Sequence, residues 1–407
     1  MPDKTSTKRV AMLAHTYYLR DPRVRREAEA LAEKGIEVHV ISLAEERNGE
    51  PQLRQAIVNG VQIHRLPISK KRGGYLRYLY EYFSVGVLGA LKLASLHLRG
   101  KLSVVHVHNM PDILVLAALI PRLSGSKLIL DVHDPMPELF MACSDRTPHN
   151  MVVRLLRLQE RISCDLADRV ITVNESMREN LQMKGVGDDK IFIVHNFPDL
   201  KLFPVNEPSL SWPRSRDSLV LLYCGTVTEQ YDLGLAVRAI ARLAGEVPVK
   251  LRILGEGNKL TEVFNLASVL GVRDSVEHIG PVPLDCVPSE MNKADIGISC
   301  HRPGVFGDLY FSTKIVEYLT QNLPVLSPQT PTITRYLCQD CLFYYEAGND
   351  AAMADTLRFM WHNPGEVLRR LTVARKLLPS LSWQSEKERF LSFYADLMDG
   401  GNAAAHW

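Results

Sequence analysis

The sequence predicts an α/β protein made of two doubly wound domains, each built on a parallel sheet. Short runs of Val, Ile and Leu alternate with helical patterns along the whole 407-residue chain. Strands of a parallel sheet have this appearance because helices cover both faces of the sheet. The chain is also longer than one ordinary hydrophobic core can serve, which favours two domains.

The first predicted domain covers residues 1–200. Its first strand, at residues 9–14, leads into a helix from about Pro22 to Lys34, which Gly35 ends, and then into a strand at 36–43. Further strands are predicted at residues 61–66, 102–107, 127–132, 169–173 and 191–194.

Four prolines between Asn196 and Asp217, with few periodic apolar residues between them, indicate a break between domains, and we place the linker at 201–217. The second domain, 218–381, has predicted strands at residues 219–224, 249–254, 276–279, 295–299, 324–326 and 342–345. The remaining residues, 382–407, are expected to form a helix that packs back on the first domain through Trp383, Phe390, Phe393 and Tyr394. Open α/β sheets bind ligands at the carboxyl ends of their strands. We therefore expect the two sheets to face each other across a cleft, with these strand ends lining it.

Composition excludes several classes of protein. A formal charge of +2 argues against a dedicated nucleic-acid binder. Seven cysteines are an odd number and do not resemble a disulfide framework, and Cys338 and Cys341 lack the surroundings of a zinc or thioredoxin-type site. The longest apolar stretch, residues 83–98, contains Lys92 and His97 and is shorter than a membrane span of about 20 residues. We therefore expect a cytoplasmic protein without a signal peptide.

The segment from Phe311 to Leu319 contains the strongest candidate site. Ser312 or Thr313 can cap a helix here, and Lys314 and Glu317 project from its first turn. A helix N-terminus favours phosphate, and a lysine adds a full positive charge, while a glutamate can accept hydrogen bonds from sugar hydroxyls. The alternative is an exposed ion pair on the helix surface, which contributes little.

Small and polar residues follow other predicted strands. Gly225 and Thr226 follow one strand of the second domain, and Gly255, Glu256 and Gly257 follow the next. Glycine allows the backbone to approach a phosphate closely, although each glycine alone could equally belong to a plain turn.

In the first domain, His108 and His133 follow two buried strands, and Glu138 could act with either histidine. The alternative for His133 is a structural histidine bonded to Asp131 or Asp134. Arg25 and Arg26 on the first helix could meet an anionic acceptor, or could simply form a solvated basic face.

Residues 65–101 combine eight lysines and arginines with several tyrosines and only one acidic residue, Glu81. Such a stretch suits peripheral contact with an anionic bilayer at the inner leaflet. An ordinary core-packed helix with a solvated face is the alternative.

Taken in order, these motifs resemble the GT-B glycosyltransferases, in particular retaining family 4 enzymes of bacterial polysaccharide synthesis. The resemblance rests on residues 21–28, 105–109, 131–134, 195–199, 223–231, 254–258 and 312–319. It implies that Glu317 contacts the nucleotide ribose, that Lys314 contacts phosphate, and that His133 helps orient the donor sugar. These three residues are therefore the expected catalytic residues.

The sequence departs from the family pattern at three positions. Thr226 and Tyr231 stand where many members carry an arginine and a lysine, and Leu309 stands where many carry a first glutamate. A subgroup of bacterial enzymes shares these changes and keeps the lysine, so we expect Lys314 to take more of the phosphate contact.

The expected activity is transfer of a sugar from a UDP- or GDP-sugar to a saccharide or polyprenyl-diphosphate-linked acceptor in surface polysaccharide assembly. No Asp-x-Asp motif occurs in the sequence, so the expected enzyme uses no metal and no cofactor. The alternatives are a sugar-nucleotide 2-epimerase and a degenerate transferase-like subunit that only binds. A dinucleotide oxidoreductase is disfavoured because no Gly-x-Gly-x-x-Gly turn follows the first strand.

Overall fold

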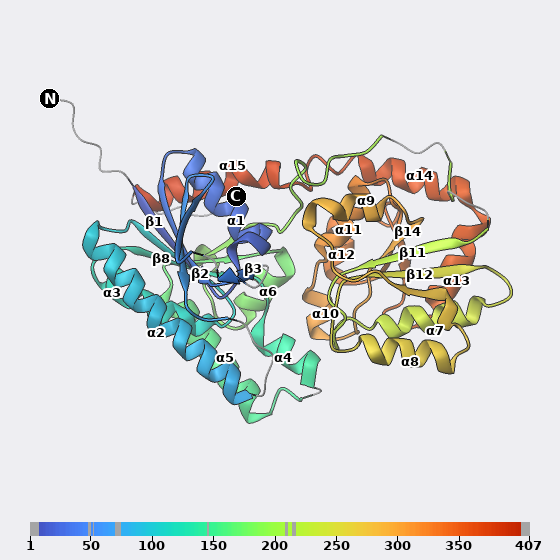
Figure 1. Ribbon diagram of the computed structural model, residues 1–407, viewed down its shortest axis with the longest axis horizontal. Helices are drawn as coiled ribbons and strands as arrows, with labels where there is room; N and C mark the ends of the chain where they lie inside the picture. Colours follow the sequence, from blue (N-terminus) through green and yellow to red (C-terminus); the bar gives the residue numbers. More distant parts are fainter. Residues whose placement is uncertain are drawn as a thin grey trace. The chain divides into compact units, whose positions relative to one another are not determined.

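A computed structural model of the chain describes residues 8–47, 50–51, 53–69, 75–144, 146–207, 211–213 and 217–399 (Figure 1). The chain divides into two compact units. Unit 1 contains residues up to 140, residues 146–195 and the C-terminal part from Glu386, while unit 2 contains residues 141–145 and 196–385. Each unit is built on one large sheet.

The sheet of unit 1 has the strand order β10-β9-β8-β7-β1-β2-β6-β5. All neighbouring strands are parallel except β5 and β6, which form an antiparallel edge hairpin that the sequence did not predict. The strands of this unit are β1 (Arg9–Ala14), β2 (Glu37–Leu43), β3 (Glu46–Arg47), β4 (Glu50–Pro51), β5 (Gln55–Val58), β6 (Val61–Leu66), β7 (Val104–His108), β8 (Lys127–Val132), β9 (Arg169–Thr172) and β10 (Ile191–Ile193).

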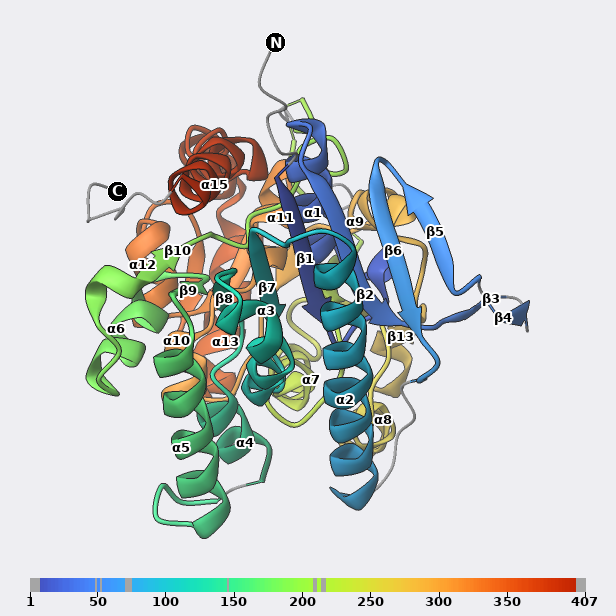
Figure 2. The same ribbon diagram turned by 90° about the vertical axis from the view of Figure 1, so that its left-hand side faces the viewer.

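Helices of unit 1 connect these strands (Figure 2). They are α1 (Pro22–Glu33), α2 (Tyr75–Arg99), the 3₁₀ helix η2 (Asp112–Ala118), α3 (Leu119–Leu123), α4 (Met136–Ser144), α5 (Met151–Leu166) and α6 (Glu175–Met183). The side chain of Asp21 caps α1 by accepting from the backbone amides of Arg23 and Val24, and Pro22 occupies the first position, where its missing N–H is not needed.

The last helix, α15 (Trp383–Met398), contributes most of its length to unit 1. The ring of Phe393 stacks on that of Phe192 at a centroid distance of 4.4 Å, and the hydroxyl of Tyr394 lies 2.7 Å from Nδ1 of His106. The helix α15 therefore contributes side chains to the core of unit 1.

Unit 2 has a fully parallel sheet with the order β13-β12-β11-β14-β15-β16. Its strands are β11 (Leu219–Cys224), β12 (Val249–Leu254), β13 (Val276–His278), β14 (Ile296–Ile298), β15 (Val325–Pro328) and β16 (Phe343–Tyr345). Its helices are α7 (Leu233–Leu243), α8 (Leu260–Val269), α9 (Val287–Met291), α10 (Val305–Leu309), α11 (Thr313–Thr320), α12 (Pro331–Tyr336), α13 (Asp350–His362) and α14 (Pro364–Arg375).

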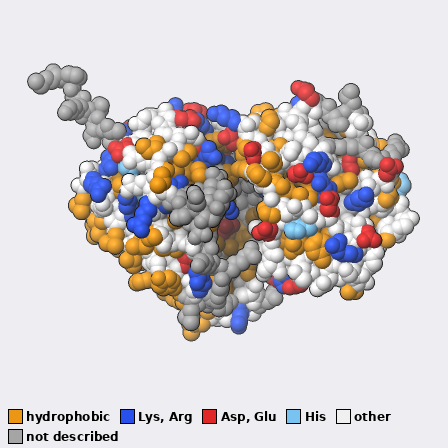
Figure 3. All heavy atoms as spheres, in the orientation of Figure 1, with side chains coloured by type: hydrophobic (Ala, Val, Ile, Leu, Met, Phe, Trp, Pro, Cys, Tyr) orange, Lys and Arg blue, Asp and Glu red, His pale blue; other side chains and the backbone are white. Residues whose placement is uncertain are grey.

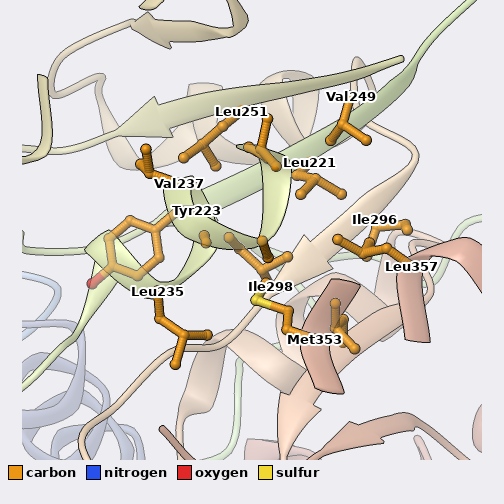
Figure 4. Close-up of a cluster of buried hydrophobic side chains, with 14 of the residues drawn as sticks. Leu221, Tyr223, Leu235, Val237, Val249, Leu251, Ile296, Ile298, Met353 and Leu357 are labelled. Carbon is orange, nitrogen blue, oxygen red and sulfur yellow. The ribbon is translucent and has the colours of Figure 1, made fainter. Parts of the chain in front are cut away.

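One face of the unit 2 sheet is covered by α7 and α13 (Figure 4). Leu235 and Val237 of α7 and Met353 and Leu357 of α13 are buried in the same cluster as apolar side chains of β11, β12 and β14. A second cluster with residues of α11, α12 and α14 covers the other face. The parallel α/β prediction is confirmed for both units.

Residues 201–217 differ from the expected linker. Phe203 is buried in the cluster that contains residues of α11, and Trp212 is buried in the cluster that contains residues of α7. The indole of Trp212 donates to the carbonyl of Asp295 at 2.9 Å. Residues 208–210 and 214–216 lie outside the described part of the chain. The aromatic residues attach this stretch to unit 2, which the spacing of prolines could not reveal.

Cys338 and Cys341 form a disulfide, which the sequence interpretation did not expect. The amide of Cys341 donates to the carbonyl of Cys338 at 2.9 Å, and this turn brings the two Cα atoms to 5.2 Å. The other five cysteines are free. No helix among the described residues is long and apolar enough to cross a membrane.

Candidate functional site

Lys314 and Glu317 lie together on the first turn of α11. The ammonium of Lys314 is 2.7 Å from Oε2 of Glu317, whose side chain is only 7% exposed, so this is not the freely exposed pair of the alternative interpretation. Burial lowers the pKa of Lys314, but the nearby Glu317 carboxylate outweighs it and leaves the pKa above its ordinary value. The pair therefore presents a permanent positive charge beside a largely buried carboxylate.

Contacts with two strands hold α11 in place. The hydroxyl of Tyr318 accepts from the amide of Cys224 at 2.8 Å and donates to the carbonyl of Leu222 at 3.2 Å, both on β11. Gly297 on β14 makes room for the ring, because a Cβ atom there would lie 2.3 Å from Tyr318. The strands thus fix the position of the helix that carries Lys314 and Glu317.

The expected side-chain cap of α11 is wrong. Ser312 occupies the N-cap position, but its side chain makes no capping hydrogen bond. The hydroxyl of Thr313 donates instead to the carbonyl of Asn196 at 3.0 Å. These hydroxyls therefore leave the first amides of the helix uncapped.

The glycine loops after β11 and β12 pack against each other. A Cβ atom at Gly255 would lie 2.1 Å from the carbonyl oxygen of Gly225, and one at Gly257 would lie 1.8 Å from that of Val227. The amide of Val227 also donates to the carbonyl of Glu256 at 2.9 Å. The close packing of the two loops therefore explains, without a ligand, why positions 255 and 257 are occupied by glycine.

Thr226 and Glu256 are exposed in these two loops. The backbone carbonyl of Thr226 accepts from the hydroxyl of Tyr223 at 2.6 Å, which fixes the loop after β11. Both residues therefore lie at the carboxyl edge of the unit 2 sheet, where the sequence placed them.

Two cations at the same edge were missed by the sequence interpretation. Lys259 lies 2.7 Å from Glu229, and Arg302, in the loop after β14, contacts the other oxygen of the same carboxylate. All three residues line a pocket of about 270 Å³. Lys259 follows Gly257 by two positions, so its place next to the glycine loop was the signal that could have identified it.

His301 precedes this arginine and is 3% exposed. Within the part of the chain that the structure describes, neither ring nitrogen has a hydrogen-bond partner, and burial lowers the pKa of the imidazole to about 4. Its ring contacts that of Tyr310 edge-on, and Tyr310 in turn lies beside Tyr231 at a centroid distance of 5.7 Å. The loops after β11 and β14 therefore meet through aromatic rings.

In unit 1, three histidines surround Asp131 at the carboxyl ends of β7 and β8. Asp131 lies 3.1 Å from Nδ1 of His133 and 3.2 Å from ring nitrogens of both His108 and His106. His108 and His133 are 3.3 Å apart through ring nitrogens. His133 thus lies against Asp131, as its structural interpretation expects, but the 3.1 Å contact between the two does not have hydrogen-bond geometry.

Burial and neighbouring charges shift the pKa values of Asp131 and His133 in this cluster. Burial would raise the pKa of Asp131, but His133 and the hydrogen bonds from the neighbouring histidines bring it well below its usual range. Burial and the nearby Arg23 lower the pKa of His133. These directions favour neutral His106 and His133 beside an ionised Asp131.

The same cluster contains the one group of potential metal ligands found in the described part of the chain. Candidate ligand atoms of Glu27, His106, His108 and Asp131 lie within 4.8 Å of one another, and all four residues are buried. Burial and the nearby Asp131 raise the pKa of Glu27 to about 7. Both nitrogens of His106 already have hydrogen-bond partners, Tyr394 and Asp131, so this residue needs no metal ion to be satisfied.

Glu138 contacts a cation rather than the two histidines. Its carboxylate lies 2.9 Å from the ammonium of Lys184, which is also 2.7 Å from Glu160. Because Glu138 and Glu160 are buried, this ion pair contributes to the packing of α4, α5 and α6. The expected partnership of Glu138 with His108 or His133 is therefore corrected.

A pocket of about 440 Å³ opens beside the histidine cluster in unit 1. His15 and Glu81 meet in it at 2.6 Å, and Tyr78, Tyr82 and Arg23 also line it. Its remaining lining comes from residues 14, 16, 21, 24, 108–110 and 134. His15 directly follows the first strand, at the edge of the sheet where ligands bind, and this position could have identified it from the sequence.

The arginine that faces this pocket is Arg23, whereas the sequence interpretation chose Arg25 and Arg26. Arg25 donates to Glu29 one turn along α1 at 2.8 Å, and Arg26 reaches the carbonyl of His195 at 3.4 Å. Neither of these two side chains lines the pocket.

Comparisons with known proteins bear on both units. The family described as "Glycosyl transferase 4-like domain" matches residues 21–196, and the family described as "Glycosyl transferases group 1" matches residues 218–363. N-acetyl-alpha-D-glucosaminyl L-malate synthase of Bacillus anthracis is 21% identical over 338 residues, which are 80% of this chain and 80% of that protein. The putative colanic acid biosynthesis glycosyl transferase WcaI of Escherichia coli strain K12 is 22% identical over 209 residues, 49% of this chain and 51% of that protein.

A solved structure has the same fold. Anabaena HepE in complex with UDP-glucose superposes with a TM-score of 0.68 at 12% identity, covering 95% of this chain and 99% of that one. Two parallel-sheet α/β units, a match to a transferase family in each, and this structural similarity lead to one conclusion: the chain belongs to the family 4-like glycosyltransferases of the GT-B fold.

Proposed function

We propose that the protein transfers a sugar from a nucleoside-diphosphate sugar to a hydroxyl-bearing acceptor with retention of anomeric configuration. The observation that carries the proposal is the pair of Lys314 and Glu317 at the uncapped start of α11. Backbone amides and the ammonium group suit the diphosphate, and the carboxylate suits the ribose hydroxyls. Anabaena HepE, which has the same fold, binds UDP-glucose, and this supports a nucleotide-sugar donor.

Transfer breaks the bond between the anomeric carbon and the diphosphate oxygen and forms a bond from that carbon to the acceptor oxygen. The departing phosphate takes the acceptor proton, so no separate general base is assigned. Lys314 stabilises the negative charge that develops on the leaving group. Lys259 and Arg302, at the same edge of the unit 2 sheet, supply two more cations for the diphosphate once Glu229 is displaced from them.

The pocket in unit 1 is the proposed acceptor site. Glu81 and His15 can hydrogen-bond saccharide hydroxyls, and Tyr78 and Tyr82 offer rings against which a sugar can pack. His133, next to this pocket through His108, is proposed to help orient the donor sugar. A saccharide or a polyprenyl-diphosphate-linked saccharide in polysaccharide assembly is the proposed acceptor, with the colanic acid relative in support.

Catalysis without a metal ion remains part of the proposal. The cations of Lys314, Lys259 and Arg302 occupy the role that a divalent ion has in enzymes with an Asp-x-Asp motif. Turnover should therefore persist in EDTA, whereas loss of activity that Mg²⁺ or Mn²⁺ restores would contradict this part.

A thermal-shift screen of UDP, GDP and ADP and their sugar conjugates tests the donor site. A ligand at 100 times its Kd should stabilise the folded chain by about 2.7 kcal/mol. The stabilisation should be lost in Lys314→Ala and Glu317→Ala and retained in Lys293→Ala, which removes an exposed lysine paired three residues away with Glu290. If all three variants respond like the wild type, the site is elsewhere.

The alternatives make different predictions for the same samples. A degenerate binding subunit, suggested by Thr226, Tyr231 and Leu309, would bind nucleotide but release no nucleoside diphosphate with any acceptor. A 2-epimerase would convert the donor without an acceptor. Anomeric analysis of a product by NMR then tests retention, since an inverted linkage would contradict it.

A further inference from the structure

The outer surface of unit 1 over α2, α3 and α5 is unusually apolar. Figure 3 shows hydrophobic side chains along the edge where Figure 1 places α2 and α3. On α2, the exposed side chains recur at helical spacing over the full length of the helix, and Phe83 is 72% and Leu98 is 83% exposed. The members of this stripe are Leu79, Tyr80, Phe83, Val87, Leu91 and Leu98. An outward face of this composition is atypical of a helix that only covers a core.

A second stripe lies on α5, which the sequence interpretation did not consider. Val153 and Cys164 face the core, while Met151, Leu155, Leu158 and Ile162 are exposed at spacings of three and four residues. They therefore form one continuous outward face of the helix.

The two helices are joined by a third element, so the stripes belong to one surface. The helix η2 packs against both α2 and α5, and α3 packs against α2 (Figure 2). This connecting segment exposes Leu116, Ile120 and Leu123, of which Leu123 is 85% exposed. Contiguous apolar surface of this extent marks an interaction site on a protein.

The exposed charges on the same elements are mostly positive, and Arg161 pairs with the exposed Asp165 at 3.9 Å. Arg154, Arg157 and Arg161 form an exposed stripe directly beside the apolar stripe of α5, and Arg77 and Arg99 are exposed on α2. The acidic residues Glu81, Asp112 and Glu160 are buried, and Asp165 is the one exposed acidic side chain on these elements within the described residues. The surface therefore combines apolar side chains with positive charge.

We propose that this surface of α2, α3 and α5 docks the protein on an anionic lipid bilayer. Apolar side chains enter the boundary between headgroups and acyl chains, and the arginines contact the anionic headgroups. The same arginines disfavour a second copy as the occupant, because pairing this face with itself brings like charges together. The proposal extends the contact expected for residues 65–101 to two further elements; Lys70, Lys71 and Arg72 of that stretch lie outside the described residues.

The surface also adjoins the proposed acceptor pocket. Tyr78, Glu81 and Tyr82 of α2 line the pocket, while Leu79, Tyr80 and Phe83 from the same turns are exposed. A lipid-linked saccharide could thus place its sugar in the pocket while its lipid stays in the bilayer. This last step rests on the proposed function; the docking itself does not.

Co-sedimentation of the full chain with sucrose-loaded vesicles tests the proposal. Vesicles of phosphatidylglycerol and phosphatidylethanolamine should bind the protein, and vesicles of phosphatidylcholine alone should bind it at least tenfold more weakly. Leu155→Glu with Leu158→Glu on α5, and separately Phe83→Glu with Leu91→Glu on α2, should each lower the vesicle-bound fraction at least tenfold. Val269→Glu, an equally exposed apolar residue on α8 of unit 2 that is 81% exposed, should leave it unchanged.

The arginines are tested in the same assay. Arg154→Gln with Arg157→Gln should weaken binding by about fivefold per arginine, and raising the salt should weaken wild-type binding. Lys34→Gln with Lys250→Gln, two exposed lysines outside the surface, should have little effect. Equal binding to both vesicle types, or unchanged binding in the α5 variants, overturns the proposal.

Sedimentation equilibrium without lipid distinguishes the competing occupant. A monomeric wild-type chain supports the bilayer. A dimer that the α5 glutamates dissociate, combined with no vesicle binding, shows that the face is instead an interface between copies. Nucleotide stabilisation in the thermal-shift assay should be the same in all these variants, so a failure of docking is separable from a failure of the donor site.

Discussion

At the scale of single residues, Lys314 is expected to carry an unusual share of the contact with the diphosphate. Thr226 and Tyr231, which stand where many relatives carry cations, offer no charge, and Lys314 lies at the start of α11 itself, whereas Lys259 and Arg302 lie on other segments. A charge-assisted hydrogen bond contributes about 1.5–3 kcal/mol. Lys314→Ala should therefore lower kcat/KM by about 10- to 100-fold in a sugar-transfer assay. A larger loss in Lys259→Ala than in Lys314→Ala would contradict this ranking.

His301 should make stability depend on pH. Its pKa is lowered from 6.5 to about 4 in the folded chain, so the unfolded state binds a proton more readily. The contribution of the neutral imidazole to the unfolding free energy is fully present above about pH 6.5. It is lost as the pH falls towards 4, at up to about 1.4 kcal/mol per pH unit.

Urea unfolding of wild type and His301→Gln at pH 7 and pH 5 measures this contribution. The difference in unfolding free energy between the two pH values should be smaller in the variant. His362→Gln, at the end of α13, is the control and should preserve the wild-type difference. An identical pH dependence in wild type and His301→Gln would show that the imidazole is not held neutral.

At the scale of elements, the position of α11 depends on a glycine in a strand. A methyl group at Gly297 would lie 2.3 Å from the ring of Tyr318, which is fixed by two hydrogen bonds to β11 and cannot move away freely. Gly297→Ala should thus cost about 1–3 kcal/mol of unfolding free energy and weaken nucleotide binding.

Gly365→Ala is the matched control, because it lies in α14 with no atom within 4 Å of the added methyl group. There the substitution should be neutral or stabilise by up to about 1 kcal/mol. Chemical denaturation followed by fluorescence gives both values. Equal effects of the two substitutions on the unfolding free energy would indicate that the ring of Tyr318 moves to make room for the methyl group.

The elements also show what a sequence pattern can and cannot predict. The apolar runs identified the parallel strands of both sheets to within a few residues, because burial on both faces leaves a direct signature. The edge hairpin of β5 and β6 was missed since its outer strand alternates in exposure. The apolar outer face of α5 was missed as well, because exposure of an apolar residue is a property of the packed fold.

At the scale of the whole molecule, the C-terminal part of the chain is needed for unit 1. Phe393 is buried against Phe192, and the hydroxyl of Tyr394 is bonded to His106 in the same core. Phe393→Ala should therefore destabilise unit 1 by about 3–5 kcal/mol. Phe359→Ala, whose side chain on α13 is 46% exposed, should cost less.

Differential scanning calorimetry can show which unit each substitution destabilises, since a chain of two units need not unfold in one step. Only the transition of unit 1 should shift in Phe393→Ala, and Phe359→Ala should shift only that of unit 2. A Phe393→Ala shift confined to the unit 2 transition would contradict the division of the chain.

The sequence by itself determined the α/β architecture, the transferase family and the placement of Lys314 beside Glu317 on one helical turn, because these depend on local periodicity and on motifs contiguous in the chain. Tertiary structure alone decided which side chains share a pocket or a face. The pairing of Lys259 and Arg302 on Glu229, the meeting of His15 with Glu81, and the apolar surface over α2, α3 and α5 all join residues distant in sequence. Such contacts depend on strand order and helix packing, which periodicity along a single segment does not specify.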